Sequence, residues 1–152
     1  MSSPINPTTT NARVDAMLTA LRAAGLRVTP QRAAICRALV TSRTHPTAQV
    51  LYNQLAGEVA GLSRATVYNT LQTLVAGGLI HDLGEAGDGA VHYDADVEPH
   101  VNLICLRCHR VDDLPTTALD QVAEQVAGRS GYQLRGARIA YYGLCPECQR
   151  AQ

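Results

Sequence analysis

Residues 63–94 of the chain, SRATVYNTLQTLVAGGLIHDLGEAGDGAVHYD, decide the fold. In the first half of this stretch, Val67, Leu71 and Leu74 recur at the spacing of one helix face. Ser63 stands directly before the pattern, where a serine hydroxyl commonly accepts a hydrogen bond from the first turn of a helix. The first half therefore predicts a helix with one apolar face and one polar face.

The second half of the stretch predicts a β-hairpin. Two short strand-like runs, 79–83 and 90–94, flank the glycine-rich segment 84–89. Glycines between two such runs favour a turn over a helix. A polar-faced helix followed at once by a hairpin is the order of elements in a winged helix-turn-helix, whose last helix normally lies in the major groove of DNA.

Three further helices are expected before residue 63, because apolar side chains recur there at helical spacing. Thr29 and Thr47 are the expected caps of the second and third helices. Cys36 lies on the apolar face of the second helix, where it is expected to be a core residue. The expected helices cover residues 12–24, 30–44 and 47–59. The inward side chains of the third are expected to be Val50, Leu51 and Leu55.

A second, smaller domain follows an acidic, proline-containing link at 95–99. Three strand-like runs and one helical pattern indicate a small α+β domain. The strands are expected at 101–105, 110–114 and 133–142, and the helix at 117–128. We therefore expect an α+β chain with a winged-helix domain at 1–94, a hinge at 95–99 and a second domain at 100–152.

The charge is divided unevenly although the formal net charge is zero. Residues 1–84 carry a net charge of +4 and residues 85–152 carry −4, and every basic residue is arginine. Arginine can grip phosphate oxygens or guanine edges in bidentate fashion, although a compositional bias toward arginine is an equal alternative. No long apolar run exists and the stretch 1–11 is polar, so we expect a soluble, cytoplasmic protein without a membrane segment.

Four cysteines form two CxxC pairs: Cys105 with Cys108, and Cys145 with Cys148. Four thiolates can close a tetrahedral shell around zinc and leave no position for water, which indicates a structural site. Two independent thiol pairs or disulfides are the alternative, as is iron on the same four thiolates, which ligand type alone does not distinguish from zinc.

A second polar cluster lies around the expected domain junction. Imidazole and carboxylate together suit a divalent transition metal, whereas polar groups in a solvated linker are the plain alternative. The members of this cluster are His45, His92, Asp94, His100, Asn102 and Asp113.

Several ordered motifs resemble the ferric uptake regulator superfamily over residues 12–150. They are LRVTPQR at 26–32, HPTA at 45–48, SRATVYNTL at 63–71, and HYD at 92–94 leading to CLRC at 105–108. The resemblance implies a homodimer, joined through the second domain, that binds an inverted-repeat operator in double-stranded DNA and represses transcription. By the same likeness the DNA-facing residues are Arg27, Arg64, Tyr68 and Asn69; for Tyr68, partial core packing is the alternative.

The resemblance also implies a regulatory Fe(II) or Mn(II) site beside the structural Zn(II) site. His45, Asp94, His100 and Asp113 match the ligand positions, while Asn102 stands where a histidine is usual. Asn102 is expected to weaken binding or to favour a harder ion such as manganese. His92 could compensate, or could be an ordinary exposed strand histidine.

Asp113 and the Tyr68–Asn69 pair look most like the peroxide-sensing branch, in which a ligand histidine is oxidised at bound iron. A manganese or iron uptake regulator without peroxide sensing is the competing interpretation. A zinc-containing thiol redox protein is the alternative from another class. We expect no enzyme, because a closed four-thiolate shell has no open coordination position and no nucleophile stands beside an evident base.

Overall fold

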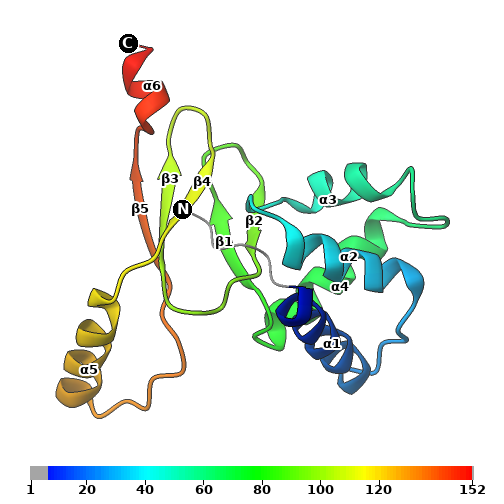
Figure 1. Ribbon diagram of the computed structural model, residues 1–152, viewed down its shortest axis with the longest axis horizontal. Coiled ribbons are helices and arrows are strands. Elements are labelled where there is room, and N and C mark those ends of the chain that lie inside the picture. The colour runs from blue at the N-terminus through cyan, green and yellow to red at the C-terminus, as the bar shows by residue number, and fades with distance from the viewer. Residues whose placement is uncertain (1–6, 152) are drawn as a thin grey trace. The chain divides into compact units, whose positions relative to one another are not determined.

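The computed structural model describes residues 7–151, so residues 1–6 and 152, including the start of the polar N-terminal stretch, lie outside the description. The described chain forms two compact units. The first runs up to Glu85 and includes Gly89–Val97; the second comprises Ala86–Asp88 and the chain from Glu98 onward. The elements, shown in Figure 1, are α1 (Pro7–Ala23), α2 (Pro30–Thr41), α3 (Ala48–Leu55), α4 (Arg64–Ala76), β1 (His81–Glu85), β2 (Val91–Asp94), β3 (Val101–Cys105), β4 (Val111–Leu114), α5 (Ala118–Ser130), β5 (Ile139–Gly143) and α6 (Pro146–Arg150).

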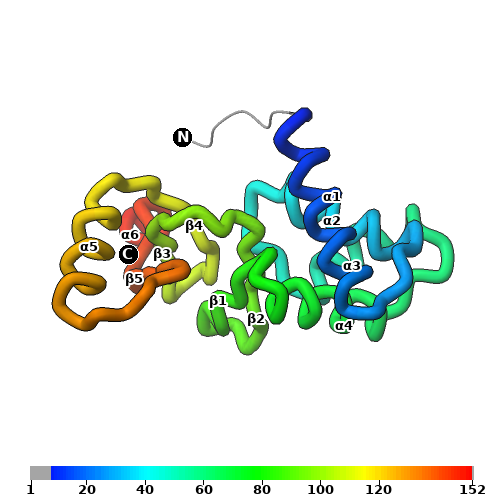
Figure 2. Tube along the Cα trace, turned by 90° about the horizontal axis from the view of Figure 1, so that it is seen from below, coloured from blue at the N-terminus to red at the C-terminus, as the bar shows by residue number. Residues whose placement is uncertain are grey.

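The first unit is a winged helix-turn-helix, as the sequence predicts. Helices α1 to α4 enclose one apolar core, and Figure 2 shows α1 passing along α2. Each fully buried leucine in such a core contributes about 1.5–3 kcal/mol relative to an exposed one. The largest buried side chains of this core are Met17, Leu21, Ile35, Leu39, Leu51, Val67, Leu71, Leu74 and Ile80. The wing is the antiparallel pair β1–β2.

Hydroxyl side chains begin three of these helices. Thr29 accepts a hydrogen bond from the Arg32 amide at the start of α2, and Thr47 and Ser63 do the same three residues ahead in α3 and α4. No acidic residue stands in the first turn of α2, α3 or α4, helices that are described in full. The capping oxygens satisfy amides that the helix itself leaves without a partner, so each helix start is fixed locally.

Several expected boundaries are wrong. Helix α1 begins earlier, at Pro7, which suits the first position of a helix because its fixed φ is helical and its missing amide is not needed there. Helices α2 and α3 end earlier, at Thr41 and Leu55. Val50 is half exposed instead of inward-facing, because only Leu51 and Leu55 lie on the buried face of the short α3.

The second unit holds a three-stranded sheet in the order β4–β3–β5, with β3 antiparallel to β4 and parallel to β5 (Figure 1). Strand β5 is shorter than expected and begins at Ile139; the short helix α6 after it was not expected at all. The apolar core of the second unit is small. Besides two cysteines, its buried apolar residues are Val101, Ile104, Val111, Leu119 and Ala86. Among residues 7–151, none of the helices has the length and apolar character needed to cross a bilayer.

Candidate metal centres and the polar face of α4

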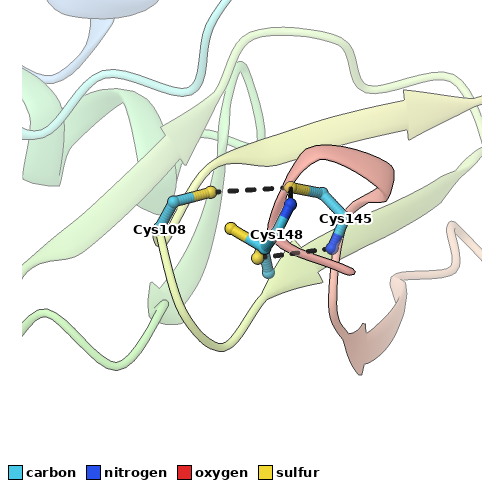
Figure 3. A group of neighbouring side chains, drawn as sticks. Cys108, Cys145 and Cys148 are labelled. Carbon is cyan, nitrogen blue, oxygen red and sulfur yellow. Dashed lines mark hydrogen bonds between the residues drawn. The ribbon is translucent and has the colours of Figure 1, made fainter. Parts of the chain in front are cut away.

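The four cysteines of the CxxC pairs meet in the second unit. Their sulfurs all lie within 4.8 Å of one another, and the Cys108 and Cys145 sulfurs are 3.8 Å apart. Figure 3 shows Cys108 reaching in from the turn between β3 and β4, and Cys145 and Cys148 from the start of α6. Zinc–sulfur bonds of about 2.3 Å in tetrahedral geometry place the sulfurs about 3.8 Å apart, so the spacing fits a single zinc ion.

Local backbone geometry aims these sulfurs. The Cys145 sulfur caps α6 by accepting the Cys148 amide, and Pro146 follows at the first helical position. The Cys145 amide in turn donates to the Cys105 sulfur at 3.4 Å. Amides that point at a sulfur stabilise its thiolate form, which is the form that binds a metal.

The pKa values of Cys105 and Cys148 are shifted in opposite directions. Backbone hydrogen bonds, first from Cys108 and then from Cys145, lower the pKa of Cys105 to about 5. The pKa of Cys148 is raised to about 12, first by its hydrogen bond to Cys145. A thiolate at Cys105 therefore disfavours a second thiolate at Cys148, and a bound cation would offset that repulsion.

The first unit brings His45 and Asp94 together, both buried. The His45 Nε2 atom is 3.6 Å from Asp94 Oδ2, while Asp94 Oδ1 accepts the Asp96 amide at 2.8 Å. The amide thereby holds Asp94 Oδ1, and Asp94 Oδ2 is turned toward the His45 imidazole. Two ligands bound at about 2.1 Å to one cation lie about 3.0–3.4 Å apart, so 3.6 Å is close to the spacing of a shared ion.

The second unit brings the buried His100 and the exposed Asp113 together at a similar distance. His100 Nε2 lies 3.5 Å from Asp113 Oδ1, and its Nδ1 atom is 2.8 Å from the Glu98 carbonyl oxygen. Since a carbonyl only accepts, the proton is on Nδ1 and the lone pair is on Nε2. A histidine that donates through one nitrogen to a carbonyl is oriented to ligate through the other.

Asn102 is the most deeply buried polar side chain of the second unit, with 2% of its surface exposed. Its Oδ1 atom has no hydrogen-bond partner among the described residues. A buried amide oxygen without a donor is costly, by about 1–3 kcal/mol, unless something else satisfies it. The donor set around Asn102 therefore fits a cation, as His100 and Asp113 do.

A family model, that of the ferric uptake regulator family, matches residues 23–142. The chain belongs to the ferric uptake regulator family. It is 36% identical over 135 residues to the "Peroxide operon regulator" of Bacillus subtilis (strain 168). The match covers 89% of this chain and 92% of the relative.

Solved structures of other family members are similar to this one. The ferric uptake regulator from Pseudomonas aeruginosa with manganese matches at a TM-score of 0.70 and 26% identity, over 84% of this chain and 96% of the other. The Helicobacter pylori regulator Fur matches at a TM-score of 0.76 over 98% and 97% of the two chains; at 20% identity this match shows the fold alone.

In this ferric uptake regulator family member, the four residues expected at DNA are all exposed on the first unit. Tyr68 is 49% exposed on α4, beside the exposed Asn69, so about half of its surface is open to solvent. Arg64 opens the same helix, and Arg27 lies in the loop before α2 with its carbonyl oxygen accepting Arg32 Nη1. All four side chains are thus open to solvent.

His92, considered above as a further ligand, contacts the backbone of His45 through one ring nitrogen. Its Nδ1 atom lies 2.7 Å from the carbonyl oxygen of His45, and residues Thr47 and His92 form an isolated β-bridge. The His92 ring thus fixes the backbone on which the His45 imidazole is mounted. A residue in this role positions a ligand.

Sequence reasoning missed three residues that organise the sites. Arg107 donates to the carbonyl oxygens of Cys148 and Ala151, which ties the first CxxC turn to the end of α6. His109 has a left-handed backbone, with φ of 61°, and its ring nitrogen lies 2.9 Å from the Ala86 carbonyl oxygen. Tyr52 lies under Arg64, whose guanidinium carbon is 5.1 Å from the ring centroid. Only the arginine inside a CxxC turn carries a local signal; the other two contacts join distant segments.

Proposed function

We propose that this chain is a dimeric, metal-dependent repressor that binds an inverted-repeat operator in double-stranded DNA. The observation that carries the proposal is the pairing of histidine with carboxylate in each unit: His45 with Asp94 in the first, and His100 with Asp113 in the second. Each pair has the spacing of metal ligands, and His45, Asp94 and His100 are buried while Asp113 is exposed. The first pair belongs to the unit that exposes the polar face of α4.

The exposed residues of the first unit have the chemistry for DNA. Asn69 can pair with an adenine edge, Tyr68 can contact a thymine methyl group, and Arg64 and Arg27 can reach phosphate oxygens. The Tyr52 ring under Arg64 restricts the guanidinium, which lowers the conformational entropy lost when it binds. The excess of positive charge in residues 1–84 supports the same role.

Metal control follows if the two pairs hold the same ion. His45 and Asp94 of domain 1–94 and His100, Asp113 and Asn102 of domain 100–152 would then restrain the hinge at 95–99. The bound Fe(II) or Mn(II) supplies the positive charge that these ligands share. Such binding selects the DNA-competent conformation only through a higher affinity for it, so loss of one ligand releases DNA.

The four cysteines would hold a structural Zn(II) that stabilises domain 100–152, the domain through which two copies associate. Peroxide response is the form of regulation that the Bacillus subtilis relative's description supports. Uptake regulation by manganese or iron without peroxide sensing is the second candidate, and the amide of Asn102 favours it. A repressor of this kind acts in the cytoplasm by binding and catalyses no turnover.

The test is DNA binding by zinc-loaded protein stripped of its second metal. A fluorescent duplex, selected from randomised inverted repeats, is titrated with and without added Mn(II), Fe(II) or Zn(II). We expect at least tenfold tighter binding with an effective metal, and loss of that gain in His100→Ala. His81→Ala, which removes a histidine of β1, is the matched control and should respond as the unchanged protein does. Equal affinity of stripped and loaded protein would show that no metal switch exists.

Peroxide sensing is tested on the same preparation loaded with Fe(II). Hydrogen peroxide should add one oxygen atom to a peptide containing His45 or His100, with water as the other product, and Mn(II)-loaded protein should remain unmodified. If both peptides keep their mass while DNA binding still depends on metal, the uptake-regulator candidate replaces the peroxide one. Sustained consumption of peroxide by protein whose cysteine thiols are free of metal would instead support the alternative of a thiol redox protein.

A further inference from the structure

The strand register surrounds Asn102 with groups that cannot satisfy its amide oxygen. Asn102 stands directly opposite Asp113 in β4 and opposite Ala140 in β5. Directly opposed residues lie on the same face of a sheet. His100, just before β3, reaches the Asp113 carboxylate, with Nε2 and Oδ1 3.5 Å apart. A carboxylate accepts hydrogen bonds but does not donate them, and an alanine side chain neither donates nor accepts. The two lateral neighbours of Asn102 therefore offer its side-chain carbonyl no donor.

A cation resolves this arrangement where a hydrogen bond does not. The side-chain oxygen of Asn102 is buried and without a partner among the described residues, and Asp113 beside it carries negative charge. Two oxygens on one sheet face, next to the Nε2 atom of His100, form an oxygen-rich half of a coordination shell. Neutral amide oxygens are used by proteins for hard divalent ions and contribute little to zinc sites.

We propose that the Asn102 amide oxygen is a direct ligand of the regulatory ion, and that it makes the site selective for Mn(II) over Zn(II). The inference rests on the proposed function, since it assumes that His45 and Asp94 complete the same shell. Four ligands, His45, Asp94, His100 and Asp113, already satisfy the tetrahedral preference of zinc. A fifth, oxygen ligand benefits an ion that prefers higher coordination, as Mn(II) does.

The experiment measures metal affinity directly, on full-length protein whose four-cysteine site is loaded with zinc. Mn(II) binding is followed by the electron paramagnetic resonance signal of free Mn(II), and Zn(II) binding by competition with a chelator. Asn102→Leu keeps the branched outline of the side chain, with a larger volume, and removes the oxygen. It should weaken Mn(II) binding about tenfold or more while Zn(II) affinity changes less than threefold. Asn102→His should raise Zn(II) affinity more than Mn(II) affinity and so reduce the selectivity.

Two variants guard against a purely structural effect. Asn102→Asp keeps an oxygen at the same place and should retain Mn(II) binding, whereas loss equal to that of Asn102→Leu would overturn the inference. Asn53→Leu makes the same change at an exposed amide of α3 and should leave both affinities unchanged. Co(II) absorption gives a second readout: Asn102→Leu should show the stronger visible bands of lower coordination.

The outcomes separate this inference from the proposed function. If His100→Ala abolishes Mn(II) binding and Asn102→Leu leaves it within threefold, the regulatory site stands and the role of Asn102 is wrong. If His100→Ala leaves Mn(II) binding unchanged, the site itself is wrong and both proposals fail. If Asn102→Leu weakens Mn(II) binding but metal has no effect on DNA affinity, the amide ligand is supported and the repressor switch is refuted.

Discussion

At the scale of single residues, Cys36 differs from Cys105 because burial outweighs the backbone hydrogen bond and the Arg37 charge that favour its thiolate. It is fully buried on α2, and this burial raises its pKa to about 11. The unfolded chain loses the proton near the ordinary value, so between about pH 9 and 11 the unfolded state binds fewer protons than the folded state. The free energy of unfolding therefore falls as pH rises through this window, by an amount on the order of 2 kcal/mol.

The measurement is urea unfolding of the protein and of Cys36→Ala at pH 8, 9, 10 and 11. The variant loses stability at every pH because a cavity is left, but its stability should fall less steeply above pH 9. Parallel slopes for the two proteins would contradict the prediction. Iodoacetamide gives an independent check, since Cys36 should stay unlabelled in the folded protein at pH 8.5.

At the scale of elements, the cap of α4 gives a sharp prediction. The Ser63 hydroxyl accepts the Thr66 amide at 3.1 Å and lies 2.9 Å from the Thr66 hydroxyl. Ser63→Ala leaves that amide without its partner and should lower the free energy of unfolding of the first unit by about 1 kcal/mol. Ser63→Asn retains a capping oxygen and should be near the unchanged protein in urea titrations followed by circular dichroism. Equal losses in both variants would mean that the hydroxyl does not act as the cap.

The same caps explain which parts of the fold the sequence predicts well. The sequence correctly predicts Thr29, Thr47 and Ser63 at the starts of their helices, because a cap depends only on residues close together in the chain. Helix ends lack such a signal: α3 ends at Leu55 although helical spacing continues to about residue 59. The exposed Val50 shows the limit of spacing, because the partner elements decide which of two adjacent apolar residues is covered.

The candidate sites divide in a similar way. The CxxC spacing predicts the four-sulfur cluster, because each pair is a local turn and the chemistry of four thiolates is specific. The ring contact of His92 with the His45 backbone and the isolation of the Asn102 oxygen depend on strand register. Register is set by long-range pairing, which one sequence does not specify.

At the scale of the whole molecule, the two units differ in how much core each possesses. The first has a continuous apolar core across four helices, whereas the second buries few large side chains around its four cysteines. Removal of zinc by a strong chelator should therefore unfold the second unit and leave the first folded. Hydrogen–deuterium exchange should show lost protection in β3, β4 and β5 with retained protection in α2 and α4.

Cys148→Ser should reproduce the effect of the chelator, and Cys36→Ala, a cysteine change outside the cluster, should not release zinc. If all helices lose protection together with the strands, the units are not independent in stability. If neither loses protection, the cluster contributes nothing to folding and the structural role of zinc is wrong.

The uncharged starts of α2, α3 and α4 have an electrical consequence. A carboxylate cap would cancel the partial positive charge that aligned peptide dipoles place at the beginning of a helix, and a hydroxyl leaves it in place. Three such half-charges remain on residues 1–84, the stretch that also carries the excess of arginine over acidic residues. These partial charges do not depend on protonation, so their attraction for a polyanion such as DNA persists at any pH at which the helices remain folded.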